Sequence, residues 1–566
     1  MNPLLKYTLA AALLTLPIIS HAQASLIGNG PDAHLQVDGQ PFFILGGELG
    51  NSSASSPADI QRIFPKLNHI GLNTVLVPAY WDLIEPTEGK FDFSLVDEAI
   101  SQAKANNLKV VFLWFGAWKN SMSCYAPLWF KADSQRFPRA HTAQGKPLEI
   151  ASAFSSNVLN ADATAFNALV SHIAKHDNDH TVIMLQIENE IGMLENARDY
   201  SPDATALFNS PVPAQLTSFL TNNTQSLNPQ LLQRWQANGS KTQGSWPDVF
   251  GNDIFSEEIF MAYHYALYVE HLAQVARRHT SIPLYVNAAL NSRGRKPGQY
   301  PSAGPLAHLI DIWHCAAPSL NFLSPDIYDS GFSDWVAQYA LPHNPLFIPE
   351  MRLSEDNGAQ AFYVFGQHNA LGVSPFSIEN ANPDGMLRKA YAKLRPLFPI
   401  LAKRTNRHGM LFQSKDDEQV FQYDGLRVTA RHFFTLPWDA RATNGSPWPL
   451  AGAILIPLAP DEFLLAGSGV VLTFQGDDEI AASANAQANL GEDGFAASGS
   501  VSNTDASPWN ATSRIGIASV DEVEPQPDGS LLRLRRLNGD EDHQGRHVRI
   551  GVDNFQILHI KLYNYQ

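Results

Sequence analysis

The sequence predicts an α/β fold in which a (β/α)8 TIM barrel, residues 25–395, is followed by a C-terminal all-β sandwich domain, residues 396–566. Three observations predict it. Short apolar segments alternate with helical patterns in the first part of the chain, which is typical of a buried parallel sheet. Further along, the helical patterns give way to short strands and turns. A chain of 566 residues, 44% of them hydrophobic, can also fill more than one core.

The N-terminal segment, residues 1–24, has the pattern of a secretory signal peptide. Lys6 precedes an apolar run from Leu9 to Ile19, and Ala22-Gln23-Ala24 gives a small-x-small cleavage pattern. The alternative is an amphipathic or membrane-spanning helix, but the apolar run is shorter than the ~20 residues that a span needs. No later segment reaches that length, so we expect an exported protein, periplasmic or extracellular, with no membrane partner after cleavage.

Eight apolar segments are candidate barrel strands. They are Phe42 to Leu45, Thr74 to Pro78, Lys109 to Phe115, Val182 to Ile187, Leu284 to Asn287, Phe322 to Pro325, Leu346 to Pro349 and Gly372 to Phe376. Eight such units over this length suit a closed barrel. The main alternative is an open doubly wound sheet, but no Gly-rich phosphate-binding motif follows the first strand.

Helical spacing of apolar residues lies between these strands. It predicts helices at Phe93 to Asn106, Ala161 to His176, Glu257 to Arg278 and Pro305 to Cys315. Two connections, Asn120 to Asn160 and Gly192 to Asn252, are too long to be plain linkers and follow strand ends where barrel enzymes build their sites. The tryptophans in or beside them either stack on sugars or pack the loops onto the barrel; these are Trp118, Trp129, Trp235 and Trp246.

The C-terminal part has the pattern of an all-β sandwich. Alternating segments at Gln419 to Tyr423, Leu426 to Ala430, Gly452 to Ile456 and Ile557 to Leu562 are separated by Gly-, Asp- and Pro-rich turns. The Ala/Gly/Ser/Asn-rich stretch from Ala481 to Thr504 predicts a loop or a weak strand pair. We expect this domain to brace the barrel, with sugar binding as the alternative role.

Charge and cysteine content exclude several classes of protein. The formal net charge is −16 and no run of Lys and Arg occurs, which argues against nucleic acid or an anionic membrane surface as the main partner. Cys124 and Cys315 are too few for a disulfide framework and lack the paired spacing of a zinc site. A single bridge between them stays open.

Carboxylates follow two of the predicted strands. In "TVIMLQIENEIG", residues 181–192, Glu188 and Glu190 end an apolar run, and in "NPLFIPEMRL" Glu350 does the same. If the strand geometry persists, Glu188 and Glu190 project to one face and Asn189 to the other. The fourth and seventh strands of a barrel bring their ends across the mouth, so we expect Glu190 and Glu350 to face each other.

Burying carboxylates is costly unless they are paired or used. Hydrolysis of a glycosidic bond needs two of them, one to protonate the leaving oxygen and one to attack the anomeric carbon or activate a water. The alternative for Glu350 is a structural ion pair with Arg352. A barrel that only binds carbohydrate is the rival in another class, but it has no need of two opposed carboxylates.

Three segments resemble the β-galactosidases of glycoside hydrolase family 35. They are "GLNTVLVPAYWDLIEPTEGKFDFS" (71–94), "QIENEIG" (186–192) and "FIPEM" (347–351), and the start motif "ILGGELGNSS" (44–53) agrees. The resemblance implies that Glu190 is the acid/base, that Glu350 is the nucleophile and that Asn189 binds the sugar 2-hydroxyl. Glu188 is then a supporting carboxylate.

The resemblance further implies a retaining exo-β-galactosidase. This chain is similar to a bacterial branch of the family, whose members remove terminal β-D-galactosyl residues from plant cell-wall oligosaccharides such as xyloglucan side chains. Where larger members have Tyr-Val-Pro-Trp and Cys-Ala-Glu, this chain has Pro78-Ala79-Tyr80-Trp81 and Asn120-Ser121-Met122, so the sugar is open. The alternatives are a β-glucosidase, an α-L-arabinosidase or a β-fucosidase of the same clan.

Five further residues are candidates for holding the sugar or the nucleophile. Tyr328, in "SPDIY", either positions Glu350 or only packs; the others are Tyr80, Trp118, Asn120 and Glu48. The mechanism needs no metal and no organic cofactor. It does require that burial and the charge of Glu350 raise the pKa of Glu190, so that Glu190 starts protonated.

Overall fold

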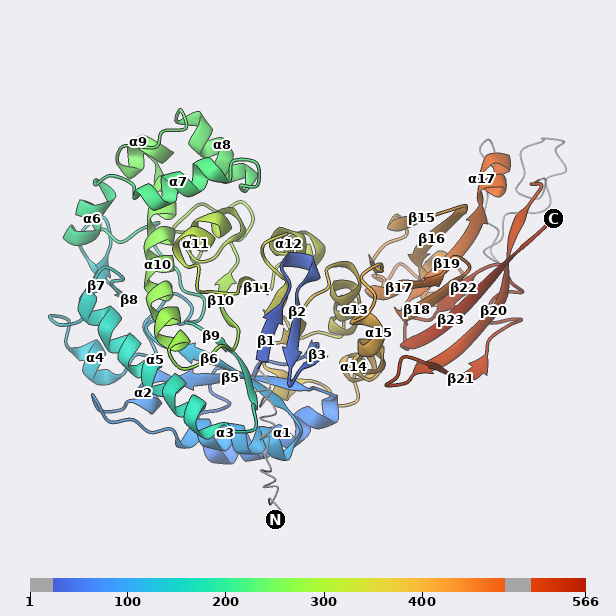
Figure 1. Ribbon diagram of the computed structural model, residues 1–566, viewed down its shortest axis with the longest axis horizontal. Helices are drawn as coiled ribbons and strands as arrows, with labels where there is room; N and C mark the ends of the chain where they lie inside the picture. The colour runs from blue at the N-terminus through green and yellow to red at the C-terminus, as the bar shows by residue number, and fades with distance from the viewer. Residues whose placement is uncertain (1–23, 484–510) are drawn as a thin grey trace, which may run out of the picture.

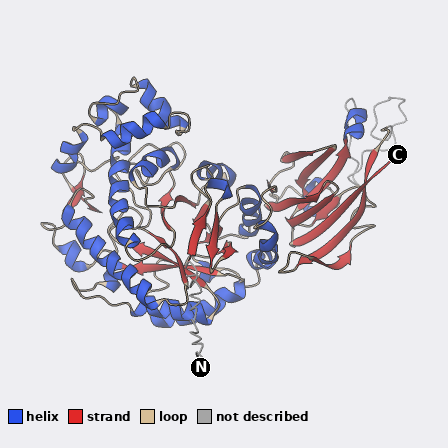
Figure 2. Cartoon of the chain, viewed as in Figure 1, coloured by secondary structure: helices blue, strands red, loops and turns tan. Residues whose placement is uncertain are grey.

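The computed structural model describes residues 24–483 and 511–566 and shows two lobes, a helix-covered barrel and a strand-rich domain (Figures 1 and 2). Residues 1–23 of the predicted signal peptide and most of the Ala481 to Thr504 stretch lie outside the described residues. Among the described residues, no helix is long and apolar enough to cross a membrane.

A small antiparallel sheet precedes the barrel. It consists of β1 (Ala24–Ile27), β2 (His34–Val37) and β3 (Gln40–Phe42), with the 3-10 helix η1 (Gly30–Asp32) between the first two strands. Asn369, just before a barrel strand, donates its amide to the carbonyl of Pro31 at 2.6 Å. The sheet therefore lies at the N-terminal end of the barrel, away from the strand ends that carry the carboxyl groups.

Eight parallel strands form the barrel, as predicted. In chain order they are β4 (Ile44–Leu45), β5 (Thr74–Tyr80), β6 (Lys109–Phe115), β9 (Val182–Gln186), β10 (Leu284–Ala289), β11 (Phe322–Ile327), β12 (Phe347–Met351) and β13 (Gly372–Pro375). The predicted first strand is wrong in its extent, because Phe42 ends β3 and only Ile44–Leu45 form β4. Hydrogen bonds of Leu76 with Gly47 (2.9 Å) and Leu49 (3.1 Å) join the first and second strands and close the sheet.

Helices cover the outside of the barrel (Figure 2). They are α1 (Pro57–Ile70), α2 (Trp81–Ile84), α3 (Ser94–Ala105), α5 (Ser156–His176), α10 (Ile254–Arg277), η2 (Ala307–Leu309), α11 (Ile310–Ala316), α12 (Phe332–Tyr339), α13 (Asn357–Gln367), η3 (Ile378–Asn380), α14 (Met386–Leu394), η4 (Arg395–Leu397) and α15 (Phe398–Leu401). The four predicted helices are confirmed as α3, α5, α10 and η2 with α11. In α1, Ser56 caps the first turn and Gly71, with a φ of 95°, ends the helix.

The two long connections contain secondary structure of their own. The first holds α4 (Leu128–Ala132) and the hairpin β7 (Arg139–His141) and β8 (Pro147–Ala151). The second holds α6 (Pro202–Phe208), α7 (Ala214–Asn222), α8 (Pro229–Ala237) and α9 (Trp246–Phe250), which form a helical layer next to α10 and α11 (Figure 1).

The tryptophans of these connections pack the loops. Trp118, Trp235 and Trp246 are buried, and half-buried Trp129 donates its indole N–H to the carbonyl of Glu85 at 3.0 Å. Of the two alternatives for these tryptophans, packing applies to the three buried ones, because the inserted helices and the hairpin supply enough apolar surface to enclose them.

Two antiparallel sheets make the C-terminal domain. The six-stranded sheet contains β14 (His408–Phe412), β17 (Ala451–Ala459), β18 (Glu462–Ser468), β23 (Gln556–Tyr565), β20 (Arg514–Pro525) and β21 (Leu531–Arg536). The four-stranded sheet contains β15 (Glu418–Tyr423), β16 (Leu426–His432), β19 (Val470–Gly476) and β22 (Val548–Ile550). Short helices η5 (Phe433–Thr435), α16 (Ala440–Thr443) and α17 (Asp477–Ser483) connect them. One apolar core fills the space between the sheets, so the sandwich prediction is confirmed.

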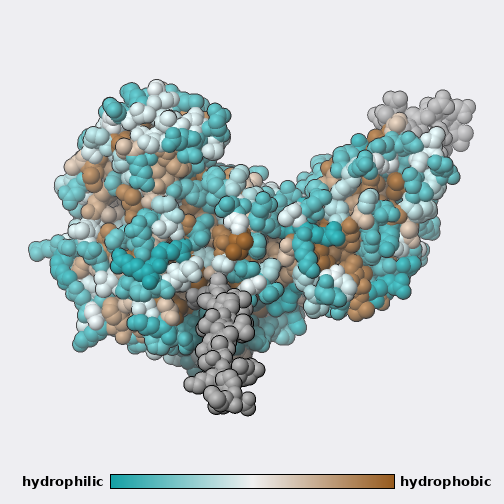
Figure 3. Space-filling view, viewed as in Figure 1, coloured by the Kyte–Doolittle hydropathy of each residue, from teal (hydrophilic) through white to brown (hydrophobic). Residues whose placement is uncertain are grey.

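The six-stranded sheet lies against the barrel through α13 and α14. Gly452 of β17 and Gly409 of β14 approach the backbone of α13 so closely that a Cβ atom at either would lie 2.1 Å from Ala359 O or 2.3 Å from Tyr363 O. Side chains of β17 and β18 join the core of the barrel. Figure 3 shows a mostly polar surface on the viewed face, with a notch between the two lobes.

Candidate active site

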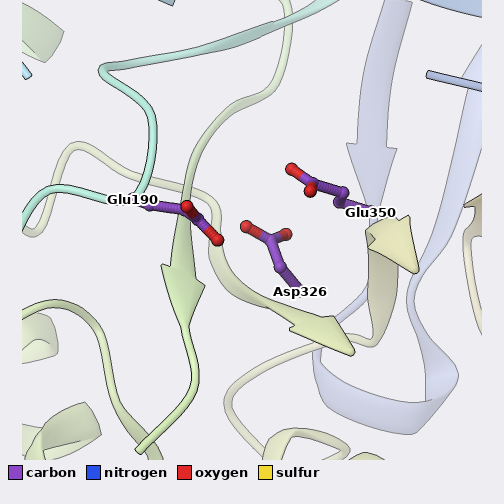
Figure 4. A group of neighbouring side chains, drawn as sticks. All are labelled: Glu190, Asp326 and Glu350. Carbon is purple, nitrogen blue, oxygen red and sulfur yellow. The ribbon is translucent and has the colours of Figure 1, made fainter. Parts of the chain in front are cut away.

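Three carboxyl groups meet at the C-terminal ends of the barrel strands (Figure 4). Glu190 follows β9, Asp326 lies in β11 and Glu350 lies in β12, where its Cα pairs in register with that of Asp326. One carboxyl oxygen of each lies within 4.8 Å of the others, and all three residues are buried. The structure thus brings Glu190 and Glu350 together across the mouth, and it adds Asp326, which our sequence analysis missed.

The backbone of the Glu188-Asn189-Glu190 segment leaves the strand conformation. Glu188 and Glu190 have φ values of 58° and 48°, in the left-handed region that non-glycine residues adopt at a cost. The predicted alternation, with both glutamates on one face, is therefore wrong. Glu190 points into the barrel mouth, whereas Glu188 points to Asp162.

Glu190 is fixed at its backbone and at its side chain. Its N–H donates to Asn287 Oδ1 at 2.9 Å, and Asn120 Nδ2 donates to its carboxyl group. Burial first, and the charge of Glu350 second, raise the pKa of Glu190 to about 7, against the opposing effect of the Lys119 ammonium. A carboxyl group in this state is half protonated at neutral pH, which suits a general acid that later acts as a base.

Two side chains, those of Tyr328 and Glu48, hold the Glu350 carboxyl group. Tyr328 Oη donates to one carboxyl oxygen, and the Glu48 carboxyl group also hydrogen-bonds to Glu350. Burial, and then the charge of Glu350, raise the pKa of Glu48 well above its usual range, so Glu48 is the protonated partner. Arg352 donates instead to the carbonyl of Tyr328 at 3.2 Å, and this contact takes the place of the ion pair considered for Glu350.

A buried lysine was also missed by the sequence analysis. Lys119 is 3% exposed, and its ammonium lies 5.0 Å from the centre of the Phe115 ring. Its charge opposes the raised pKa values of Glu48, Glu190 and Asp326. No sequence signal marked it, because a single lysine in a loop is usually solvated.

The other predicted residues divide into two groups. Asn189 is fully buried beside the carboxyl groups, and neither its amide N nor its amide O has a partner among the described residues. Trp118 packs edge-on between Tyr265 and Tyr268, and Tyr80 accepts a hydrogen bond from Ala54 N at 3.3 Å. Trp118 and Tyr80 therefore support the walls of the barrel mouth.

Glu188 forms a second carboxyl pair beneath the site. Its side chain hydrogen-bonds to that of Asp162, and its Oε2 accepts from the N–H of Trp118 at 2.8 Å. Asp162 accepts from Trp114 Nε1 at 2.8 Å and from Tyr268 Oη at 2.7 Å. Burial first, and then the charge of Asp162, raise the pKa of Glu188 well above its usual range.

The spacing of the three carboxyl groups in the mouth is also one that a divalent cation could bridge. The donors are all oxygen atoms, but the raised pKa of Asp326 and the nearby Lys119 ammonium both disfavour a cation there. Cys124 and Cys315 form no bridge with each other, since both are free, Cys124 exposed and Cys315 buried.

Comparison with known families gives two matches along the chain. Residues 53–258, from α1 to α10, match the family model described as "Beta-galactosidase", glycoside hydrolase family 42. This part of the chain resembles a β-galactosidase. The match supports a glycoside hydrolase, but it does not confirm family 35, which is a different family. Residues 387–549 match a "Domain of unknown function (DUF5597)".

A curated relative agrees with the first match. A β-galactosidase of Xanthomonas manihotis is 26% identical over 219 residues, which cover 36% of this chain and 34% of that protein. The chain thus spans about a third of the length of this relative.

Similar solved structures are those of β-galactosidases. That of the psychrophilic Marinomonas ef1 has a TM-score of 0.43 and 13% identity, and covers 63% of this chain and 60% of its own. That of the haloarchaeon Halorubrum lacusprofundi has a TM-score of 0.43 and 16% identity, and covers 62% and 57%.

Proposed function

We propose that this chain is a retaining exo-β-galactosidase in which Glu350 is the nucleophile and Glu190 is the acid/base. The observation that carries the proposal is the distance between the two residues, whose nearest carboxyl oxygens lie within 4.8 Å of each other. A pair this close fits the separation of about 5–5.5 Å in retaining enzymes better than the about 6.5–9.5 Å at which inverting enzymes admit a water.

The proposed reaction has two steps. The Glu350 carboxylate attacks the anomeric carbon while the glycosidic bond breaks and Glu190 gives its proton to the leaving oxygen. In the second step a water molecule gives a proton to Glu190. The oxygen of this water attacks the anomeric carbon, which breaks the ester bond and restores the Glu350 carboxylate. The ester removes the charge of Glu350, so the pKa of Glu190 falls when a base is needed.

The proposed substrate is a terminal β-D-galactosyl residue, as on xyloglucan side chains of plant cell walls. The family match, the curated relative and the sequence resemblance support galactose. The unpartnered amide of Asn189 supports a hydrogen bond to the sugar 2-hydroxyl. A panel of aryl β-galactosides, β-glucosides, β-fucosides and α-L-arabinosides tests the sugar, and galactose release from xyloglucan oligosaccharides tests the source.

A nucleophile variant tests the mechanism. Glu350→Gly should lose nearly all hydrolysis of an aryl β-galactoside, because the carboxylate that attacks the anomeric carbon is absent. Added azide should restore turnover and give the α-galactosyl azide, because azide enters the space of the missing carboxylate.

The matched control is Glu195→Gly. Glu195 is exposed and has a φ of 67°, which glycine adopts readily, so this variant should keep wild-type activity and ignore azide. Full activity of Glu350→Gly without azide would remove Glu350 from the nucleophile role.

We further propose that the chain is exported. The support is the N-terminal pattern of Lys6, the apolar run from Leu9 to Ile19 and Ala22-Gln23-Ala24. N-terminal sequencing of protein recovered from periplasm and medium tests it, with cleavage near Ala24 as the expected result. An intact N-terminus on cytoplasmic protein alone would contradict it.

A further inference from the structure

We infer that Asp326 is a positioning residue, which holds the Glu190 carboxyl group by donating a hydrogen bond to it as a neutral carboxylic acid. The inference deepens the proposed function and rests on it, since that function gives Glu190 its acid/base role. Nothing in the three sequence motifs that resemble known enzymes points to Asp326, which is 2% exposed at the centre of the carboxyl cluster.

The position of Asp326 is fixed by the barrel. It lies in β11 between β10 and β12, and its Cα pairs with those of Ala289 and Glu350. In Figure 4 its carboxyl group lies between those of Glu190 and Glu350. No segment outside the barrel sheet is needed to place it.

Asn287 links Asp326 to Glu190 a second time. Asn287 Nδ2 donates to Asp326 Oδ2 at 2.6 Å, and Asn287 Oδ1 accepts from the backbone N–H of Glu190 at 2.9 Å. One amide thus joins the Asp326 carboxyl group to the left-handed backbone of Glu190. The side chain of Glu190 also hydrogen-bonds to Asp326 directly.

The second oxygen of Asp326 requires a proton. Asp326 Oδ1 is buried and has no N–H or hydroxyl donor among the described residues. Burying a carboxylate oxygen without a partner is unfavourable, whereas a proton held between Asp326 and Glu190 gives that oxygen a partner. Burial first, and then the charge of Glu350, raise the pKa of Asp326 well above its usual range, which agrees with a proton on the unpartnered Oδ1.

Groups on every neighbouring element act on Asp326. The carboxyl groups raise its pKa, and the ammonium of Lys119 lowers it. The titratable groups that face Asp326 are Glu350, Glu190, Glu48, Lys119, Tyr285, Tyr328 and Tyr339.

Asp326 keeps its proton through both steps of the reaction. When Glu190 gives its proton to the leaving oxygen, the new carboxylate accepts the hydrogen bond of Asp326. When water returns a proton to Glu190, the same bond orients the carboxyl group for the next cycle. Asp326 therefore touches no reacting atom, and it acts through Glu190.

The variant Asp326→Asn distinguishes a neutral Asp326 from an ionised one. The readout is kcat/KM against pH for phenyl β-galactoside, whose leaving group needs the proton of Glu190. Asparagine keeps a neutral donor and an acceptor for Asn287. The basic limb of the profile, where kcat/KM falls as pH rises, should therefore stay at the same pH while kcat/KM falls by about tenfold or less. If Asp326 were ionised, its removal would lower the pKa of Glu190 and move the limb down, which would overturn the inference.

The variant Asp326→Ala removes the donor and should move the basic limb of the profile to higher pH. Without the hydrogen bond the Glu190 carboxylate is less stable, so the pKa of Glu190 rises and the residue loses its fixed orientation. An unchanged limb in Asp326→Ala would also overturn the inference. The control is Asp311→Asn, a buried aspartate of α11 that accepts from Asn228 N at 2.6 Å and should leave the profile as in wild type.

Infrared difference spectroscopy tests the same point without turnover. The spectrum of the wild type minus that of Asp326→Asn should show the carbonyl band of a protonated carboxylic acid at neutral pH. A carboxylate band in its place would overturn the inference. This test remains decisive even where Asp326→Ala does not fold, because it does not use that variant. Wild-type protein that hydrolyses no aryl glycoside but shows the band would end the proposed function and leave Asp326 as a neutral donor.

Discussion

Six carboxyl groups in and beneath the site form three pairs. These pairs are Glu48 with Glu350, Asp326 with Glu190, and Glu188 with Asp162. A close pair of carboxylates cannot stay doubly ionised when it is buried, so each pair retains a proton. The ammonium of the buried Lys119 opposes the raised pKa of Glu48 in the first of these pairs.

The pKa of Glu190 predicts how activity depends on pH. Glu190 must be protonated to assist the leaving group, so kcat/KM for phenyl β-galactoside should be lost as pH rises through about 7. In Glu190→Ala this basic limb should disappear, and turnover of phenyl β-galactoside should fall by about 10²–10⁴-fold.

An activated substrate is the comparison for that variant. A dinitrophenyl β-galactoside needs no proton for its leaving group, so its first step should lose far less in Glu190→Ala. The burst of dinitrophenol in rapid-mixing experiments measures that step. Equal losses for both substrates would contradict the acid role of Glu190.

At the scale of elements, the contact between α13 and the six-stranded sheet depends on glycine. Gly452 and Gly409 on the strands and Gly366 on the helix meet backbone atoms that no Cβ atom could approach. This close approach lets Ile454 and Ile456 of β17 enter the core of the barrel. α13 directly follows the loop after β12, so the sandwich supports the strand that carries Glu350.

Gly452→Ala should destabilise the protein at this contact. The new Cβ would lie 2.1 Å from the carbonyl oxygen of Ala359, and backbone atoms must shift to admit it. We expect a loss of about 1–3 kcal/mol, seen as a lower Tm in thermal unfolding. Gly551→Ala is the control, since nothing lies within 4 Å of its Cβ position, and a Tm as low as that of Gly452→Ala would refute the explanation.

At the scale of the whole molecule, the two lobes share apolar surface. Residues of β17, β18, β20 and β23 belong to the same apolar cluster as the barrel strands and helices. Phe555 stacks on Phe362 of α13 at 5.2 Å between ring centres. The sandwich thus packs on the barrel, and its described strands contribute none of the three carboxyl groups of the mouth.

Removal of the sandwich should therefore damage the barrel. A chain that ends at residue 402 would expose the apolar faces of α13 and α14, and we expect aggregation or a much lower Tm. Size-exclusion chromatography and thermal unfolding measure this. A soluble, monodisperse barrel with the Tm of the full chain would show that the two lobes are independent.

Much of the fold was predictable from local pattern. Strands buried on both faces read as continuous apolar runs, and the eight barrel strands were located in this way. The helices α6–α9 were missed because a segment rich in Pro, Asn and Ser resembles a loop, although Ser201 and Asn228 cap two of these helices.

The sequence by itself determined the barrel, the sandwich and the two glutamates at the ends of the fourth and seventh strands, because strand periodicity and a charged residue after an apolar run are local signals. Only the tertiary structure decided which groups surround those glutamates. Asp326, Lys119 and Asp162 lie on other elements than Glu190, and the packing of barrel strands and helices brings them together. Their protonation depends on burial and mutual charge, which exist only after the chain has folded.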